Sequence, residues 1–156
     1  MKLVLAAALA LTAASPLLAQ TVATPVAVDI STAMPSDGRW TYSTVPGGSE
    51  VTFANAAAMP QLTIRCARPT RQIIISKPAT GAAPFIFLWT SGLTRNVPAS
   101  FNPATARISA TLSAFDALLD AVAFSRGRVA VSVSGQPTLV LPAWSEAARV
   151  IEDCRT

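Results

Sequence analysis

The stretch that decides the fold is QLTIRCARPTRQIIIS, residues 61–76. In its first six residues apolar and polar side chains alternate, which places Leu62, Ile64 and Cys66 on one side. A period of two is typical of a strand with one buried face. The chain then turns at Pro69 and returns as a second apolar run. The pattern therefore predicts an antiparallel hairpin that contributes one face to a core.

Similar runs recur on both sides of this hairpin, separated by short turn sequences that contain Gly or Pro. Phe85–Thr90 (FIFLWT) is apolar on both faces, so we expect a central strand. Gly135-Gln136-Pro137 is expected to turn one strand into the next, and Pro98–Pro103 is expected to be a loop. The further predicted strands are Arg39–Thr44, Glu50–Ala54, Leu93–Val97, Arg107–Leu112, Arg128–Ser134 and Thr138–Leu141.

In two segments the apolar residues recur with the period of a helix. The first helix is predicted to begin at Ser113, with Asp116 in its first turn, where the helix dipole favours a negative charge. Gly127 is well placed to end it. Its expected apolar side consists of Phe115, Leu118, Leu119 and Val122. The second helix is expected to follow Pro142. Its expected buried side consists of Trp144, Ala147, Ala148, Ile151 and Cys154.

The chain has two cysteines, Cys66 and Cys154, and the pattern places both on faces that should pack. We therefore expect a disulfide that closes a loop of roughly ninety residues. The predicted fold class is α+β, mainly antiparallel β, as a sandwich or one strongly bent sheet. A short helix accompanies the sheet, and the disulfide fastens a C-terminal helix to it.

The first residues, MKLVLAAALALTAASPLLA, combine a positive charge at Lys2, an apolar stretch and small residues at its end. This is typical of a signal peptide, predicted here as residues 1–19. Residues 20–35 are expected to be a flexible leader and residues 36–156 a single globular domain. Pro16 argues against an uncleaved membrane anchor. We therefore expect a periplasmic or secreted protein with no stable membrane span after cleavage.

The composition excludes several kinds of catalytic and metal site. The chain has no His, which excludes a Ser–His–Asp or Cys–His arrangement, and two thiols alone cannot complete a metal shell. Its 12 basic residues are scattered, so nucleic-acid binding is not expected. Lys77 is interpreted as the end of a strand, not as half of a Ser–Lys dyad. We expect no cofactor, no metal and no enzymatic activity. The acids considered for a hydrolase are Asp116, Asp120, Glu146, Glu152 and Asp153, which the pattern places on solvated helix surfaces.

Five residues are candidates for contacts. Arg126 and Arg128 flank a glycine and could bind an anion or a partner together, or they could complement the end of a helix. Trp40, Trp89 and Trp144 could form an aromatic contact surface, although their phase with apolar neighbours favours packing in the core.

The chain also resembles a known type of protein. Trp40, the LTIRC segment that ends at Cys66, a helix, a Val-rich hairpin and a last helix ending in VIEDCR follow in this order. The layout is similar to that of type VI secretion-associated periplasmic accessory proteins and, more loosely, of invasion-associated locus B proteins. The PAWSE segment and the loop lengths depart from the secretion-type layout. The resemblance implies a non-catalytic envelope protein and carries over no site residues.

We therefore expect a non-enzymatic exported domain that acts through contacts with another envelope protein. The alternative is a binder of a small molecule or glycan that uses an aromatic cleft, and a carboxylate-pair hydrolase is the third hypothesis. The sequence leaves the oligomeric state open.

Overall fold

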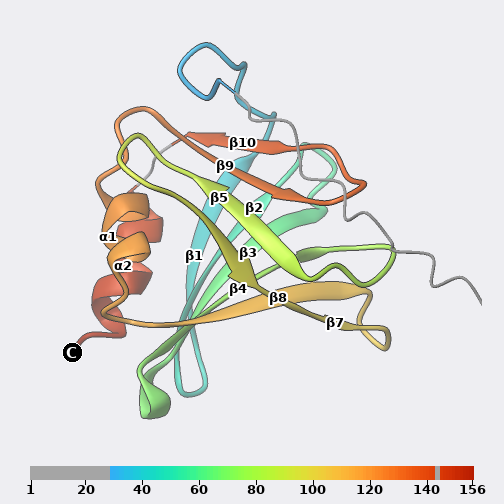
Figure 1. The fold of residues 1–156 in the computed structure, drawn as a ribbon. Coiled ribbons are helices and arrows are strands. Elements are labelled where there is room, and N and C mark those ends of the chain that lie inside the picture. Colours follow the sequence, from blue (N-terminus) through green and yellow to red (C-terminus); the bar gives the residue numbers. More distant parts are fainter. Residues whose placement is uncertain (1–28, 143–144) are drawn as a thin grey trace, which may run out of the picture.

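The computed structural model describes residues 29–142 and 145–156. In this part of the chain the strands form two antiparallel sheets (Figure 1). Sheet A has the order β1-β2-β3-β4-β8-β7, and sheet B has the order β10-β9-β5-β6. The strands of sheet A are β1 (Arg39–Val45), β2 (Gly48–Ala54), β3 (Pro60–Ala67), β4 (Gln72–Pro78), β7 (Ser100–Asn102) and β8 (Arg107–Ser113). Those of sheet B are β5 (Phe85–Trp89), β6 (Thr94–Pro98), β9 (Arg128–Val133) and β10 (Leu139–Pro142).

One continuous core joins the inner faces of the two sheets and the two helices. Phe53 and Ile75 of sheet A and Leu88 and Leu141 of sheet B are at most 2% exposed. Burying a side chain of this size contributes about 1.5–3 kcal/mol. The predicted hairpin is present, with Ile64 opposite Ile75 in the register of β3 and β4. The prediction of a mainly antiparallel β fold with two helices is confirmed, and of the two architectures the structure is the sandwich.

The helices pack against each other at one end of the sandwich, whereas the β9–β10 turn lies at the opposite end (Figure 1). Helix α1 spans Ala117–Ala123 and α2 spans Ser145–Asp153, and a short 3₁₀ helix covers Arg68–Thr70. The predicted start of α1 at Ser113 is wrong, because β8 continues to that residue. Asp116 is the N-cap and accepts a hydrogen bond from the Leu118 amide. Helix α1 also ends before Gly127, with Phe124 as its C-cap.

The chain crosses from sheet B to sheet A between β6 and β7. Pro98–Pro103 was expected to be a loop, but Ser100–Asn102 form β7, which pairs with β8. The two prolines that suggested a loop lie at the end of β6 and just beyond β7, where no ladder donor is required. Phe101 packs against the core, which gives this short strand an inner face.

The edge strand β10 is covered by the chain that leads into β1. The Ser36 amide donates to the carbonyl oxygen of Val140 at 2.7 Å, and the Val140 amide donates to Ser36 Oγ at 3.1 Å. Trp40 Nε1 donates to the Pro142 carbonyl at 3.4 Å. These bonds satisfy backbone groups at an edge that would otherwise face solvent.

Residues 29–33 are fastened to the outer face of sheet B. Ile30 and Ala33 pack against a small cluster that contains Phe87 and Trp89, and Arg128 donates hydrogen bonds to the carbonyls of residues 30 and 31. This part of the predicted leader is therefore in contact with the domain. The predicted signal peptide and residues 20–28 lie outside the described residues.

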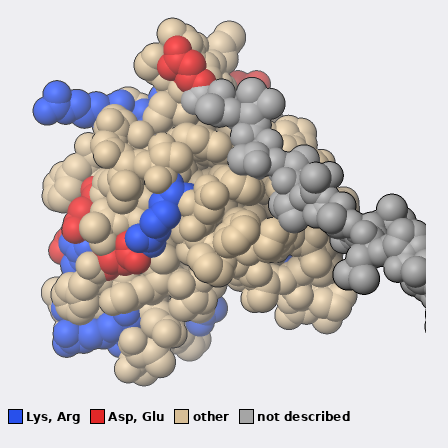
Figure 2. Space-filling model, viewed as in Figure 1, with Lys and Arg blue, Asp and Glu red and all other residues tan. Residues whose placement is uncertain are grey.

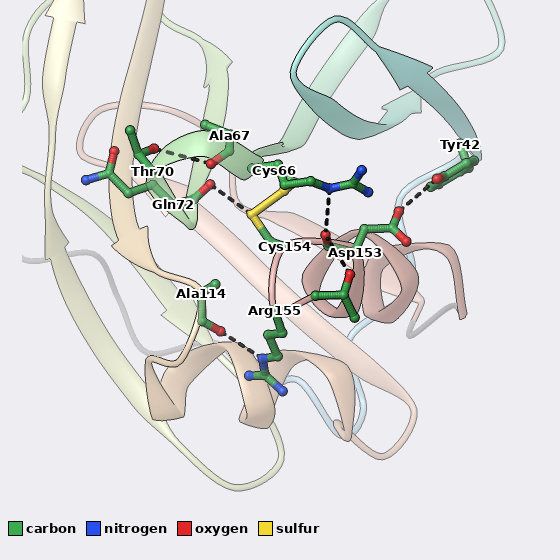
Figure 3. The surroundings of a disulfide bond; sticks show 11 residues. Tyr42, Cys66, Ala67, Thr70, Gln72, Ala114, Asp153, Cys154 and Arg155 are labelled. Carbon is green, nitrogen blue, oxygen red and sulfur yellow. Dashed lines mark hydrogen bonds between the residues drawn. A yellow bond between two sulfur atoms is a disulfide. The ribbon is translucent and has the colours of Figure 1, made fainter.

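Helix α2 is fastened to sheet A by several different bonds (Figure 3). The predicted disulfide joins Cys66 of β3 to Cys154, which follows the helix, with their Cα atoms 5.4 Å apart. Tyr42 Oη of β1 donates to Asp153 Oδ2 at 2.7 Å. Just beyond the helix, Arg155 Nε donates to the carbonyl of Ala114, the residue that follows β8, at 2.9 Å. Neither α1 nor α2, the α-helices of the described residues, has the length and apolar composition of a membrane span.

The outer face of sheet A is largely polar. In the strand register, one hydroxyl residue on each strand lines up across the whole sheet. The row consists of Thr41, Thr52, Thr63, Ser76, Ser109 and Ser100. Arg107 donates to the hydroxyls of Thr63 and Ser76, each at 3.0 Å. Cross-strand pairs of this kind stabilise a sheet, and their hydroxyl groups keep its outer face hydrophilic.

Candidate functional site

The two candidate arginines have different surroundings. Arg128 begins β9, and its guanidinium is bonded to carbonyls of the N-terminal segment. Arg126 is exposed, and its side chain has no hydrogen bond or ion pair to another described residue. Only its backbone amide is bonded, to Ser91 Oγ at 2.9 Å. Of the two, Arg126 presents its charge to solvent, whereas Arg128 holds the protein's own chain.

Trp40 and Trp89 have packing roles. Trp40 is half-buried and meets the ring of Phe53 edge-on, with 5.2 Å between centroids. It also borders a core void of about 20 Å³, which has room for about one water molecule. Trp89 is 9% exposed and stacks on Phe87 at 6.0 Å. Trp144 lies outside the described residues.

Three large apolar side chains are exposed around α1, and we call them the α1 face. Phe115 precedes the helix, Phe124 caps its end, and Leu93 lies in the β5–β6 turn. They are 59%, 76% and 36% exposed, respectively. Phe115 was expected on the buried side of a helix that begins at Ser113. Because α1 begins four residues later, Phe115 precedes the helix and is left outside the core.

Local hydrogen bonds join two of the segments that form the α1 face. Ser125 Oγ accepts from the Ser91 amide at 3.1 Å and donates to the Arg128 carbonyl at 2.7 Å. The β5–β6 turn therefore touches the end of α1, which places the segments that carry Leu93 and Phe124 beside each other. At the start of the helix, Arg95 of β6 forms an ion pair with Asp116 at 2.7 Å.

The pKa of Asp116 reflects this arrangement. Partial burial by itself would raise the pKa, but hydrogen bonds from Arg95 and from the Leu118 amide, together with the Arg95 charge, outweigh burial. The pKa of Asp116 is therefore below its ordinary value of 3.8. The carboxylate remains ionised at neutral pH and serves as a helix cap.

The acids near α1 are neutralised by arginines, and charges of both signs lie side by side over the helices (Figure 2). Asp120 and Glu152 both pair with Arg155, at 2.6 and 2.9 Å. Arg71 lies 6.0 Å from the centre of the Phe115 ring. Among the described residues, neither Arg71 nor Arg126 has an acidic partner. Phe115 therefore has one of these two arginines beside its ring, and Phe124 has the other, two residues further along the chain.

The same pairing bears on the hydrolase hypothesis. Asp116 forms an ion pair with Arg95, and Asp120 forms one with Arg155. Hydrolysis by a carboxylate pair instead requires two acids that lie on either side of the substrate's scissile bond. The observed ion pairs therefore do not favour the hydrolase hypothesis. Within the described residues no group of three or more His, Cys, Asp or Glu side chains could hold a metal ion.

Comparison with protein-family models, with curated proteins and with solved structures found no match for this chain. The resemblance to type VI secretion-associated and invasion-associated proteins therefore remains an expectation from the sequence pattern.

Proposed function

We propose that the protein is a non-enzymatic exported domain that acts in the cell envelope by binding another protein through the α1 face. The observation that carries the proposal is the exposure of Phe115 and Phe124, 59% and 76%, in a domain with a well-formed core. Single exposed apolar residues are ordinary, but a group of them on adjacent segments marks contact surfaces. Aromatic residues and Arg are also enriched among the residues that dominate binding energy.

The charges define the partner's chemistry. Arg71 lies 6.0 Å from the centre of the Phe115 ring, Arg126 follows Phe124 by two residues in the chain, and neither arginine has an acidic partner among the described residues. A complementary surface would receive Phe124 in an apolar recess flanked by carboxylates. Such charges mainly raise the association rate and select the partner. The phenylalanine rings, once buried in the complex, would supply most of the affinity.

Photo-crosslinking in cells tests this proposal. The full chain carries p-benzoylphenylalanine in place of Phe124, and the covalent products are separated by mass. We expect an adduct with one protein of discrete size. Its yield should fall about tenfold in Arg126→Glu, which corresponds to a loss of about 1.4 kcal/mol of binding free energy.

Met59 provides the matched control, because it is 60% exposed and lies in the β2–β3 turn, away from α1. The photoreactive residue at position 59 should give no discrete adduct. An equal adduct from both positions, lipid adducts alone, or an adduct of twice the chain mass would contradict the proposal.

A further inference from the structure

A second feature lies at the end of the sandwich opposite the helices. Lys77 continues the inward-facing series Ile73, Ile75, Lys77 along β4, and Ile108 is its partner in the register with β8. The residue is 8% exposed, so most of its side chain is shielded from solvent. Lysine is rarely buried to this extent unless its charge is paired.

The Lys77 charge has no counter-ion among the described residues. Its Nζ donates to Gln136 Oε1 in the β9–β10 turn at 2.9 Å, and this is the one polar partner found for it there. An ammonium group has three donors, and burying it without a carboxylate is unfavourable. Burial accordingly lowers the pKa of the Lys77 amine below its ordinary value of 10.5.

Lys77 borders an open cleft of about 770 Å³. The volume is within the range of small-molecule sites and far larger than a single water or ion requires. Turns of both sheets supply its polar lining. The lining includes Ser36, Asp37, Asn55, Gln61, Thr80 and Thr138. Of the residues that line the cleft, Lys77 and Asp37 carry charge, and Asp37 is exposed.

We propose that this cleft binds a small organic anion whose carboxylate or phosphate oxygen accepts a hydrogen bond from Lys77 Nζ. The ligand would supply the counter-ion that Lys77 lacks among the described residues. The hydroxyl and amide groups of the lining would form hydrogen bonds with its polar substituents. Asp37 would disfavour a second anionic group and accept from a hydroxyl or amino group of the ligand. This site is separate from the α1 face and does not depend on it.

A purely structural role for Lys77 makes the opposite prediction about stability. If the lysine stabilises the fold, replacing it by methionine should destabilise the protein. If the lysine is kept for a ligand, removal of its unpaired charge should leave the fold as stable or more stable, because methionine fits an apolar strand position of similar size. Only the second outcome, combined with loss of binding, fits a binding site.

The test uses the full chain with inorganic phosphate and with D-glucuronate, and with neutral glucose as the control ligand. Lys2 and Lys77 are the only lysines, so [¹³Cε]lysine labelling gives at most two signals, which Lys77→Met assigns. We expect phosphate or glucuronate, but not glucose, to shift the Lys77 signal and to raise the melting temperature. The anion that acts distinguishes a phosphate ligand from a carboxylate ligand.

Lys77→Met should weaken binding at least about tenfold with no loss of melting temperature. Arg65→Met, which removes an exposed positive charge from the neighbouring strand β3, should bind as the wild type does. The proposal is overturned if neither anion shifts the Lys77 signal, if Lys77→Met binds equally well, or if Lys77→Met lowers the melting temperature as a structural lysine would.

Discussion

Asp116 links two parts of the helical end, because it caps α1 and forms an ion pair with β6. We expect Asp116→Ala to lower the free energy of unfolding by about 1–2 kcal/mol, the usual effect of losing a carboxylate cap. Denaturant unfolding at pH 7 measures this difference.

The pH dependence of that effect follows from the lowered pKa of Asp116. An acid whose pKa is lower in the folded state stabilises the fold above its unfolded value, here about 3.8, and loses this contribution as the pH falls through the folded value. The difference between wild type and Asp116→Ala should therefore shrink below about pH 3.8. Asp116→Asn keeps a good cap without the charge, so it should show the smaller defect. Equal defects in both variants at all pH values would contradict this account.

Single residues were predictable from the sequence where their place in the apolar alternation and their chemistry agreed. Both cysteines were in phase with apolar neighbours, and the predicted bond is present. Lys77 was interpreted from its immediate neighbours as the end of a strand, although the alternation of Ile73 and Ile75 continued to it. That phase was the available signal for a buried lysine. Its partner Gln136 is 59 residues away, and no local pattern indicates such a contact.

At the scale of elements, a change of period located each helix, but capping decided where α1 begins. A hydroxyl at Ser113 and a carboxylate at Asp116 are both good caps, and the pairing of β8 with β4 through Ser113 left the role to Asp116. The strand β7 was missed because three residues are too few to show a period, and its pairing with β8 is a tertiary effect.

The Cys66–Cys154 disulfide is the covalent link between β3 and the end of α2. The disulfide joins residues 88 positions apart, and the chain-entropy model gives about 4–5 kcal/mol for a loop of this length. We expect Cys154→Ala to lower the free energy of unfolding by up to this amount. Amide exchange should speed up in α2 first, because the helix loses its covalent link to β3 while the pairing within the sheets is unchanged.

The double variant Cys66→Ala/Cys154→Ala is the control. It should match Cys154→Ala in stability, since either change removes the same bond. If amide exchange sped up equally in α2 and in the central strands β3 and β4, the disulfide would be stabilising the molecule as a whole and not the helix in particular.

At the scale of the whole molecule, the order of strands was beyond the sequence pattern. Alternation shows which side of a strand is buried, but the adjacency of β4 and β8 and the assignment of β5 and β6 to the other sheet depend on contacts between distant segments. Hairpins of consecutive strands were predictable because their contacts are local in the sequence. The division of the strands into two sheets was not predictable because it depends on contacts between distant segments. The α1 face and the cleft at the opposite end also follow from this division, so neither surface was predictable.

The covered edge of β10 has a consequence for the protein in storage and at high concentration. Leu139, Val140 and Leu141 form a short apolar strand whose outer backbone groups would be a template for fibre growth if they were uncovered. Ser36→Pro removes the amide that donates to Val140 and should shorten the lag time of thioflavin-positive aggregation. Ser36→Ala keeps that amide and loses only the hydroxyl acceptor, so its lag time should lie between those of the proline variant and the wild type. Equal lag times for all three proteins would show that this edge has no part in resistance to amyloid.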